Sequence, residues 1–206
     1  MAEKILAPGK RHLENLPGLV IDVLDMASIQ LSDVDAFAAA IGPGSFSGVR
    51  IGLAAIKGYC LALNKPVIGI SSLNVLLSQA AYDVDSAIAV IEAGRGDVFA
   101  GHASSFDGQT PKGVTTAIVA RKDFREFSHK LMPDNVVICG GAVIGELGLS
   151  PDNADLRVIE VPFPSICGFL AHERLINSDV DDLFLLTPLY MRKSDAEEKL
   201  VKKPAA

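Results

Sequence analysis

The chain has 206 residues, of which 49% are hydrophobic and 21% charged, a composition typical of a folded protein with one large or two small domains. Its 19 basic and 25 acidic residues give a net charge of −6, which argues against nucleic-acid binding by the chain alone, because phosphate contacts need clusters of Lys and Arg. The cysteines are odd in number and widely spaced, which indicates neither a zinc site nor a disulfide framework and favours a reducing, cytoplasmic compartment. We expect no signal peptide and no membrane span, since no apolar run reaches about 18 residues.

The first half of the chain predicts one strand–helix–strand unit flanked by helices. An apolar strand over residues 36–41 leads through a Gly/Pro/Ser loop into a helix, and a second strand follows over residues 66–70. Such a crossover implies two parallel strands with a right-handed connection. The helices of this half are expected over residues 16–24, 49–63 and 73–81. Pro17 suits the first turn of the first helix, and Ser72 can cap the third.

Strands and helices also alternate in the second half, so the predicted fold class is α/β. Strands are expected over residues 87–91, 97–103, 114–119, 136–139 and 157–161, the first two forming a hairpin across the turn 92–96. Helices are expected over residues 122–131, 142–147 and 165–176, the last capped by Ser165, with a loop over 106–113 and an extended piece over 188–191. The polar stretch 83–85 suggests lobes over 1–84 and 85–192, and residues 193–206 suggest a frayed tail.

The helix after the Gly/Pro/Ser loop has two apolar faces, whereas a helix that lies on a sheet needs only one. One stripe consists of Val49, Leu53, Ile56, Cys60 and Leu63. The other consists of small residues around one aromatic: Gly48, Gly52, Ala55, Tyr59 and Ala62. The small stripe allows a second backbone to approach closely, either another part of this chain or a partner protein. The general preference for core packing favours the first alternative.

The loop before this helix consists of Gly42, Pro43, Gly44, Ser45, Phe46, Ser47 and Gly48 and resembles a phosphate cradle, because helix N-termini bind anions. It lacks the Lys of a Walker loop, since Val49 follows Gly48. It also departs from the dinucleotide fingerprint, because Ser47 occupies the third glycine position and no acidic residue lies between residues 36 and 82. The alternative is a tight turn with Ser47 as the helix cap.

No catalytic residue, metal site or cofactor is predicted. Neither Ser45 nor Ser71 has the flanking glycines of a nucleophile elbow. No histidine has a second histidine at the helical spacing that zinc peptidases use. Glu92, Arg95 and Asp97 share one turn, which favours a solvated hairpin tip over a functional charge cluster.

The block from residue 42 to residue 73, GPGSFSGVRIGLAAIKGYCLALNKPVIGISSL, resembles the signature of the bacterial TsaB (YeaZ) family. The matching residues are Gly42, Pro43, Gly44, Ser45, Phe46, Gly48, Arg50, Gly52, Lys57, Pro66, Ser71, Ser72 and Leu73. Residues 11–14, 92–99 and 188–192 resemble further family motifs.

This resemblance implies duplicated actin-like, sugar-kinase-like (ribonuclease H-like) lobes. It implies a non-catalytic subunit that binds TsaD, the enzyme that transfers a threonylcarbamoyl group to the adenosine beside the anticodon of tRNA. It also implies that TsaE, an ATPase, joins the two proteins. The chain would then contact tRNA only as part of this complex. The resemblance also favours a partner, or a second copy, at the small stripe, with His12 at the entry to the first helix and Leu16 of that helix beside it. The alternatives are a weak ATPase and a glycoprotease-like peptidase of the same superfamily.

The chain departs from the family pattern in two places. Family members usually begin with a strand that carries Asp-Thr-Ser, followed by a hairpin strand, and this sequence starts about where the third strand should end. We therefore expect a first lobe without its first strands and with an exposed sheet edge. In the turn after residue 91, Glu92 replaces Asp and Gly94 is inserted before Arg95.

Overall fold

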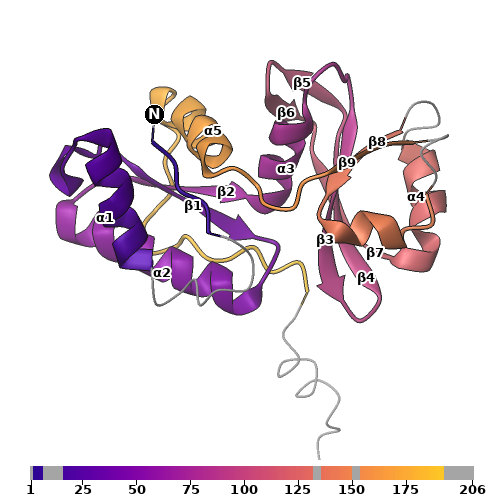
Figure 1. Ribbon diagram of the computed structural model, residues 1–206, viewed down its shortest axis with the longest axis horizontal. Helices are drawn as coiled ribbons and strands as arrows, with labels where there is room; N and C mark the ends of the chain where they lie inside the picture. Colours follow the sequence, from indigo (N-terminus) through magenta and orange to yellow (C-terminus); the bar gives the residue numbers. More distant parts are fainter. Residues whose placement is uncertain (1, 7–15, 132–135, 150–153, 193–206) are drawn as a thin grey trace, which may run out of the picture.

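The computed structural model describes residues 2–6, 16–131, 136–149 and 154–192. These residues form an α/β structure with two main sheets side by side, one of two strands and one of five, as Figure 1 shows. A small hairpin makes a third sheet. The predicted fold class is confirmed.

The smaller main sheet is the predicted crossover. Strand β1 (Phe37–Gly42) pairs in parallel with β2 (Val67–Ser71), and helix α2 (Phe46–Leu63) connects them. Helix α1 (Leu16–Ala27) and the short 3-10 turn η1 (Leu31–Asp33) precede β1. Among the described residues no strand precedes β1.

The larger sheet has the order β7-β4-β3-β8-β9. Its strands are β3 (Ala87–Gly94), β4 (Asp97–Ala103), β7 (Thr115–Ala120), β8 (Val136–Gly140) and β9 (Ala154–Val158). β3, β4 and β7 are antiparallel neighbours, while β8 and β9 continue the sheet in parallel with β3. The predicted hairpin is confirmed; Arg95 and Gly96 at its tip both have positive φ, which matches the right-handed twist of the two strands.

Local details of several predictions are wrong. The expected loop over 106–113 contains the hairpin of β5 (Ser105–Asp107) and β6 (Thr110–Lys112), and the expected helix over 142–147 is the 3-10 helix η3 (Ala142–Glu146). The last strand, β9, begins and ends earlier than predicted. Helix caps also differ: Ser45, not Ser47, accepts a hydrogen bond from the Gly48 N–H at 3.3 Å, and α3 and α5 follow Ser71 and Phe163.

Each half of the chain contributes one helix to the sheet of the other half. Helix α3 (Ser72–Ala80) follows β2 but packs through Leu73 and Leu77 on the five-stranded sheet. Helix α5 (Pro164–Ile176) comes from the second half but packs through Leu170 and Ala171 on β2. The far face of the larger sheet is covered by α4 (Phe124–Leu131), after the turn η2 (Arg121–Asp123). The boundary at 84/85 remains a prediction, and each sheet takes a helix from across it.

After α5 the chain returns along the two-stranded sheet and reaches the five-stranded one. Asp181 bridges to Val67 of β2, and its carboxylate accepts hydrogen bonds from the Gly69 N–H and from Arg174. Further on, the Leu189 N–H donates to the Ile41 carbonyl at 2.8 Å. Residues 179–192, which we call the C-terminal strap, therefore hold both strands of the smaller sheet.

Candidate protein-interaction surface

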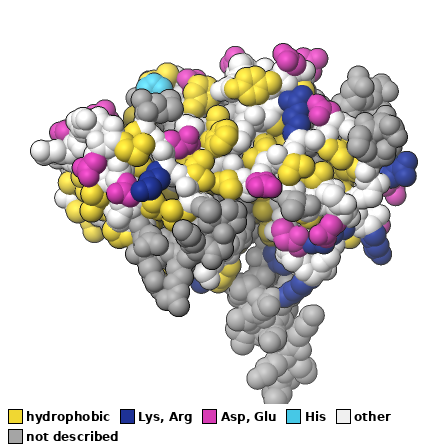
Figure 2. Space-filling model, viewed as in Figure 1, with side chains coloured by type: hydrophobic (Ala, Val, Ile, Leu, Met, Phe, Trp, Pro, Cys, Tyr) yellow, Lys and Arg dark blue, Asp and Glu magenta, His cyan; other side chains and the backbone are white. Residues whose placement is uncertain are grey.

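Helix α1 offers an apolar surface that the described chain does not cover. Its sequence, LPGLVIDVLDMA, is mostly apolar, yet none of its residues is buried and none belongs to a hydrophobic core cluster. Ile21 and Met26 are 59% and 62% exposed. Figure 2 shows hydrophobic side chains at the surface of this end of the molecule. An apolar helix face of this kind gains stability only when another body covers it.

The first stripe of α2 packs inward as predicted. Leu53 and Cys60 are its buried residues, and Ile56 and Leu63 pack with them against Phe37 and Val67 of the sheet. Helices α2 and α5 thus lie on opposite faces of β1 and β2, as Figure 1 shows. The core face of α2 is confirmed, whereas the role of the second stripe stays a prediction.

The second stripe lies beside the core face and is only partly covered. Gly48, Gly52, Ala55 and Tyr59 are half-buried and Ala62 is exposed. A Cβ atom at Gly52 would meet nothing within 4 Å, so there is open space above it. The Tyr59 ring stacks on Phe37 with centroids 5.7 Å apart and is therefore engaged within the chain. The structure places Leu16 half-buried at the start of α1, while His12 lies outside the described residues.

The polar side of α2 is fixed by the C-terminal strap. The Arg50 Nε donates to the Tyr190 hydroxyl at 2.6 Å, and its guanidinium carbon lies 3.7 Å from the Phe46 ring centroid. Lys57 donates to the Phe184 carbonyl at 3.5 Å. By length and composition alone α2 is apolar enough to cross a membrane, contrary to the expectation that no apolar run reaches this length. Its two charged residues, Arg50 and Lys57, both donate hydrogen bonds to the strap.

The glycine loop lines a cleft of about 510 Å³ between the two sheets. The loop contains a cis Gly42–Pro43 peptide bond. Gly42 has φ 102° and a Cβ there would lie 3.3 Å from the Leu189 carbonyl, so only glycine fits between β1 and the strap. The two charged residues that line the cleft are engaged in ion pairs, Glu92 with Arg121 and Arg192 with Asp97.

The turn expected as a solvated hairpin tip takes part in two ion-pair systems. Arg121 pairs with both Glu92 and Glu146, and Arg192 joins Asp97 to the Ala93 carbonyl. These pairs tie the hairpin to η3 and to the C-terminal strap. Glu92 remains exposed, as a solvated tip predicts, whereas Asp97 is half-buried against Arg192. The partners of both carboxylates lie far away in sequence, so the turn alone could not reveal them.

The groups with nucleophilic or metal-binding chemistry do not converge. Within the described residues no three His, Cys, Asp or Glu side chains form a group that could hold a metal ion. Burial raises the pKa of the Cys139 thiol to about 12 and that of Cys167 to about 11, which keeps both protonated. His102 and Ser86 lie 3.0 Å apart, but the Ser86 hydroxyl donates to the Ala103 carbonyl at 2.8 Å, so the imidazole Nε2 must donate to Ser86. This arrangement is that of a structural pair.

We predict that His102 makes the fold less stable in mild acid. Burial lowers the pKa of His102 below its ordinary value, so the unfolded chain takes up this proton at a higher pH than the folded chain. The free energy of unfolding should then fall as the pH drops below about 6.5. Urea denaturation at pH 7.5 and 5.5 measures this, and His102→Gln should reduce the difference between the two pH values. An unchanged difference would assign the pH dependence to other groups.

The chain superposes on two solved structures of Pseudomonas aeruginosa proteins. One, described as an uncharacterized protein with similarity to peptidase YeaZ, has a TM-score of 0.75 at 24% identity and matches 89% of this chain and 85% of its own. The other, YeaZ, has a TM-score of 0.74 at 23% identity, over 88% and 86% of the two chains. These likenesses show the fold, which is the fold of the YeaZ structures.

Residues 7–139 match the family model described as TsaD, tRNA N6-adenosine threonylcarbamoyltransferase, which is more than half of the chain. The chain belongs to this family, and within it is TsaB/YeaZ-like. It is 36% identical over 93 residues to the tRNA threonylcarbamoyladenosine biosynthesis protein TsaB of Escherichia coli, covering 44% of this chain and 40% of that protein.

Two further relatives differ in how much they share. A tRNA N6-adenosine threonylcarbamoyltransferase of Kosmotoga olearia is 41% identical over 64 residues, 31% of this chain and 19% of that enzyme. An uncharacterized protein of Mycobacterium tuberculosis is 28% identical over 200 residues, 96% of this chain and 82% of that protein. The matches thus span less than half of the E. coli and Kosmotoga relatives.

Proposed function

We propose that this chain is a non-catalytic scaffold subunit that binds TsaD and supports threonylcarbamoyl transfer to the adenosine beside the anticodon of tRNA. The observation that carries the proposal is the exposure of two helices: no residue of α1 is buried, and the small stripe of α2 is only partly covered. Catalysis belongs to the TsaD partner in the cytoplasm, TsaE joins the complex, and tRNA is met only through it. The family membership of residues 7–139 and the relationship to E. coli TsaB support this assignment.

The geometry of α2 suits a helix–helix contact. Its 18 residues give a rod of about 27 Å, long enough for several turns of close packing. The open space above Gly52 and the small side chains of Ala55 and Ala62 permit close approach of a second backbone. A specific complex buries roughly 1,000 Å² or more, so the proposed interface includes α1 as well as α2. A homodimer through the same helices uses the same surface and competes with TsaD.

The test is size-exclusion chromatography with light scattering, on this chain alone and mixed with TsaD from the same organism. A new peak at the heterodimer mass is the expected result. Two separate peaks, with the chain folded by circular dichroism, would overturn the proposal. A homodimer that persists beside free TsaD would show self-association in place of the proposed heterodimer.

A weak ATPase is the second candidate, favoured by the glycine loop at the N-terminus of α2 and by the cleft of about 510 Å³ that it lines. Nucleotide at 100 times its dissociation constant should stabilise an ATPase by about 2.7 kcal/mol. For a scaffold we expect ATP with Mg²⁺ to leave the thermal unfolding temperature unchanged. A clear upward shift, abolished by Gly44→Val in the loop, would favour the ATPase. For the peptidase alternative no feature of the described residues supplies an argument.

A further inference from the structure

The two outer strands of the five-stranded sheet differ in charge. At one edge, β9 carries Asp155 and Arg157, which form an ion pair. Charged side chains on an outer strand oppose its pairing with another chain. At the other edge, β7 has the sequence TTAIVA, and no charged residue lies within residues 113–120. Among the described residues the one strand that pairs with β7 is β4, so its outer edge lacks the protection that β9 has.

The hydrogen bonds of β7 show which of its backbone groups are free. Just beyond the strand, the Arg121 N–H donates to the Gly96 carbonyl at 3.0 Å, in register with the β4–β7 ladder. Bonded and non-bonded pairs alternate along an antiparallel ladder, so every second residue of β7 directs its N–H and C=O away from β4. These residues are Thr116, Ile118 and Ala120. Such a row of outward donors and acceptors is a template for another strand.

The side chain in the middle of this row is apolar. Ile118 is 40% exposed, whereas its neighbours Ala117 and Val119 turn to the other face and pack in the core beneath α4. A single exposed isoleucine is ordinary on a protein surface. Here it lies between two sets of outward backbone groups, so the edge combines hydrogen bonding with an apolar contact at its centre.

The edge matches a second copy of itself. In antiparallel pairing about a twofold axis at Ile118, the Ile118 side chains of the two copies are direct neighbours and cover each other. Thr116 of each copy then lies opposite Ala120 of the other, which joins all the outward groups in about six backbone hydrogen bonds. A twofold interface of this kind uses the same surface on both copies.

Charge and register agree with this pairing. In this register Arg121 and Lys122 of one copy lie opposite uncharged residues of the other, Thr115 and Val114. Like charges, which would oppose the pairing, therefore do not meet. A shift by one residue would turn the bonding groups away, and a shift by two would separate the two isoleucines. One register is thus favoured over its neighbours.

We propose that two copies of this chain pair through the outer edges of their β7 strands and form one continuous antiparallel sheet about a twofold axis at Ile118. The strand has six residues and spans about 20 Å. Such a contact belongs to the small interfaces, below about 1,200 Å², so the dimer is weak and forms at high micromolar concentration. Figure 1 shows α1 and α2 in one half of the molecule and β7 in the other, so this pairing leaves the proposed TsaD surface free and does not depend on the proposed function.

Analytical ultracentrifugation of the chain from about 1 to about 300 µM measures the self-association. Ile118→Lys places like charges opposite each other at the axis, and a lysine suits an outer strand. Val158→Lys is the matched control, because Val158 is 59% exposed on β9, the opposite edge of the same sheet. Gly52→Leu separates this dimer from one that forms through α2. Hydrogen exchange at the Thr116, Ile118 and Ala120 amides tests the same edge without any substitution.

We expect a concentration-dependent dimer of the unmodified chain, of Val158→Lys and of Gly52→Leu, and at least tenfold weaker association of Ile118→Lys. The three amides should exchange at least tenfold more slowly in the concentrated sample than in the dilute one. A chain that stays monomeric throughout overturns the proposal, as does a dimer that Gly52→Leu dissociates or that a folded Ile118→Lys retains. Protection of these amides already in the dilute monomer also overturns it, because a segment of the chain itself would then cover the edge.

Discussion

Replacing Gly52 by Leu is expected to weaken binding of a TsaD partner at least a hundredfold, or by about 2.7 kcal/mol. A Cβ at this position meets nothing within 4 Å in the free chain, so the new side chain stands in the open space where the partner's backbone would approach. Overfilling a close helix contact is costly, because packed helices have no room for a leucine where glycine stood. The chain itself should gain up to about 1 kcal/mol of stability, since leucine favours the helix over glycine.

Isothermal titration calorimetry with TsaD measures the binding, and urea denaturation measures the stability. Gly58→Leu is the matched control: it makes the same substitution in the same helix, also in open space, but about 120° away around the helix axis from Gly52. We expect Gly58→Leu to bind nearly as well as the unmodified chain. If Gly52→Leu binds TsaD normally and is folded, the small stripe of α2 is not the interface. If both variants lose binding, the interface is wider than the stripe.

Phe124→Ala is expected to lower the free energy of unfolding by about 3–5 kcal/mol. Phe124 is fully buried at the start of α4, where its ring lies 5.8 Å from the Phe127 ring and packs with Val98 and Val119 of the sheet. Truncation leaves a cavity between α4 and the sheet that rigid strands cannot close. A loss of this size is a large fraction of the 5–15 kcal/mol that a folded domain has.

The control is Phe184→Ala in the C-terminal strap, the same substitution at a side chain that is 78% exposed. Its removal should change stability by no more than about 0.5 kcal/mol. Urea unfolding of both variants by circular dichroism gives the comparison. A Phe124→Ala chain as stable as Phe184→Ala would mean that α4 contributes little to the core of the larger sheet.

The parts of the fold that depend on neighbouring residues could be predicted. The β1–α2–β2 crossover follows from one apolar run, one loop and one periodic helix, and the β3–β4 hairpin follows from two runs around Arg95 and Gly96. The β5–β6 hairpin was missed because its strands have three residues each and one contains Pro111. The caps of α2 and α3 were displaced because two serines stand near each of these helix starts, and sequence alone does not say which one is the N-cap. Helix α5 begins at Pro164, one residue before the predicted cap Ser165.

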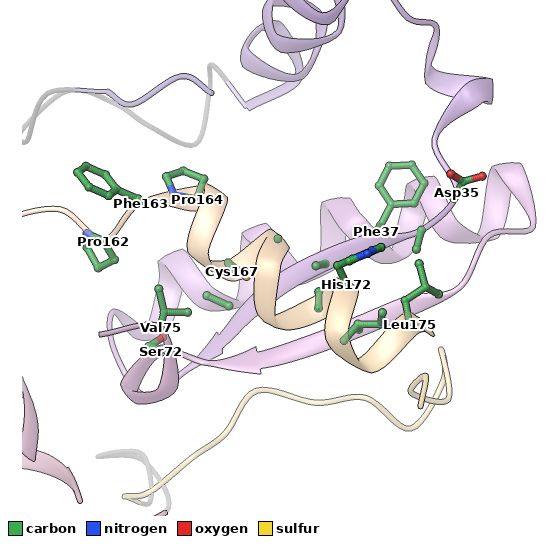
Figure 3. Close-up of a pocket in the computed structure, with 16 residues that line it drawn as sticks. Asp35, Phe37, Ser72, Val75, Pro162, Phe163, Pro164, Cys167, His172 and Leu175 are labelled. Atoms are coloured by element: carbon green, nitrogen blue, oxygen red, sulfur yellow. The ribbon is translucent and has the colours of Figure 1, made fainter. Parts of the chain in front are cut away.

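The long-range contacts of the site could not be predicted from local patterns. Arg50 and Tyr190 are 140 residues apart, and nothing in either segment indicates that they meet. The groove of about 700 Å³ between β1 and α5 (Figure 3) could be predicted only with the position of α5, which depends on the packing of Leu170 and Ala171. The second apolar face of α2 was visible, because its small residues recur at helical spacing. That a partner covers this face stays a prediction.

The exchange of α3 and α5 between the two sheets has a consequence for how the molecule comes apart. A cut at residues 83–85 would leave each fragment with a helix made for the other fragment's sheet, and each sheet with a bare apolar face. Neither half should then be soluble when produced alone, whereas co-production should let the fragments reassemble. The intact chain should accordingly unfold in a single cooperative step, with no intermediate in which one half is folded and the other unfolded.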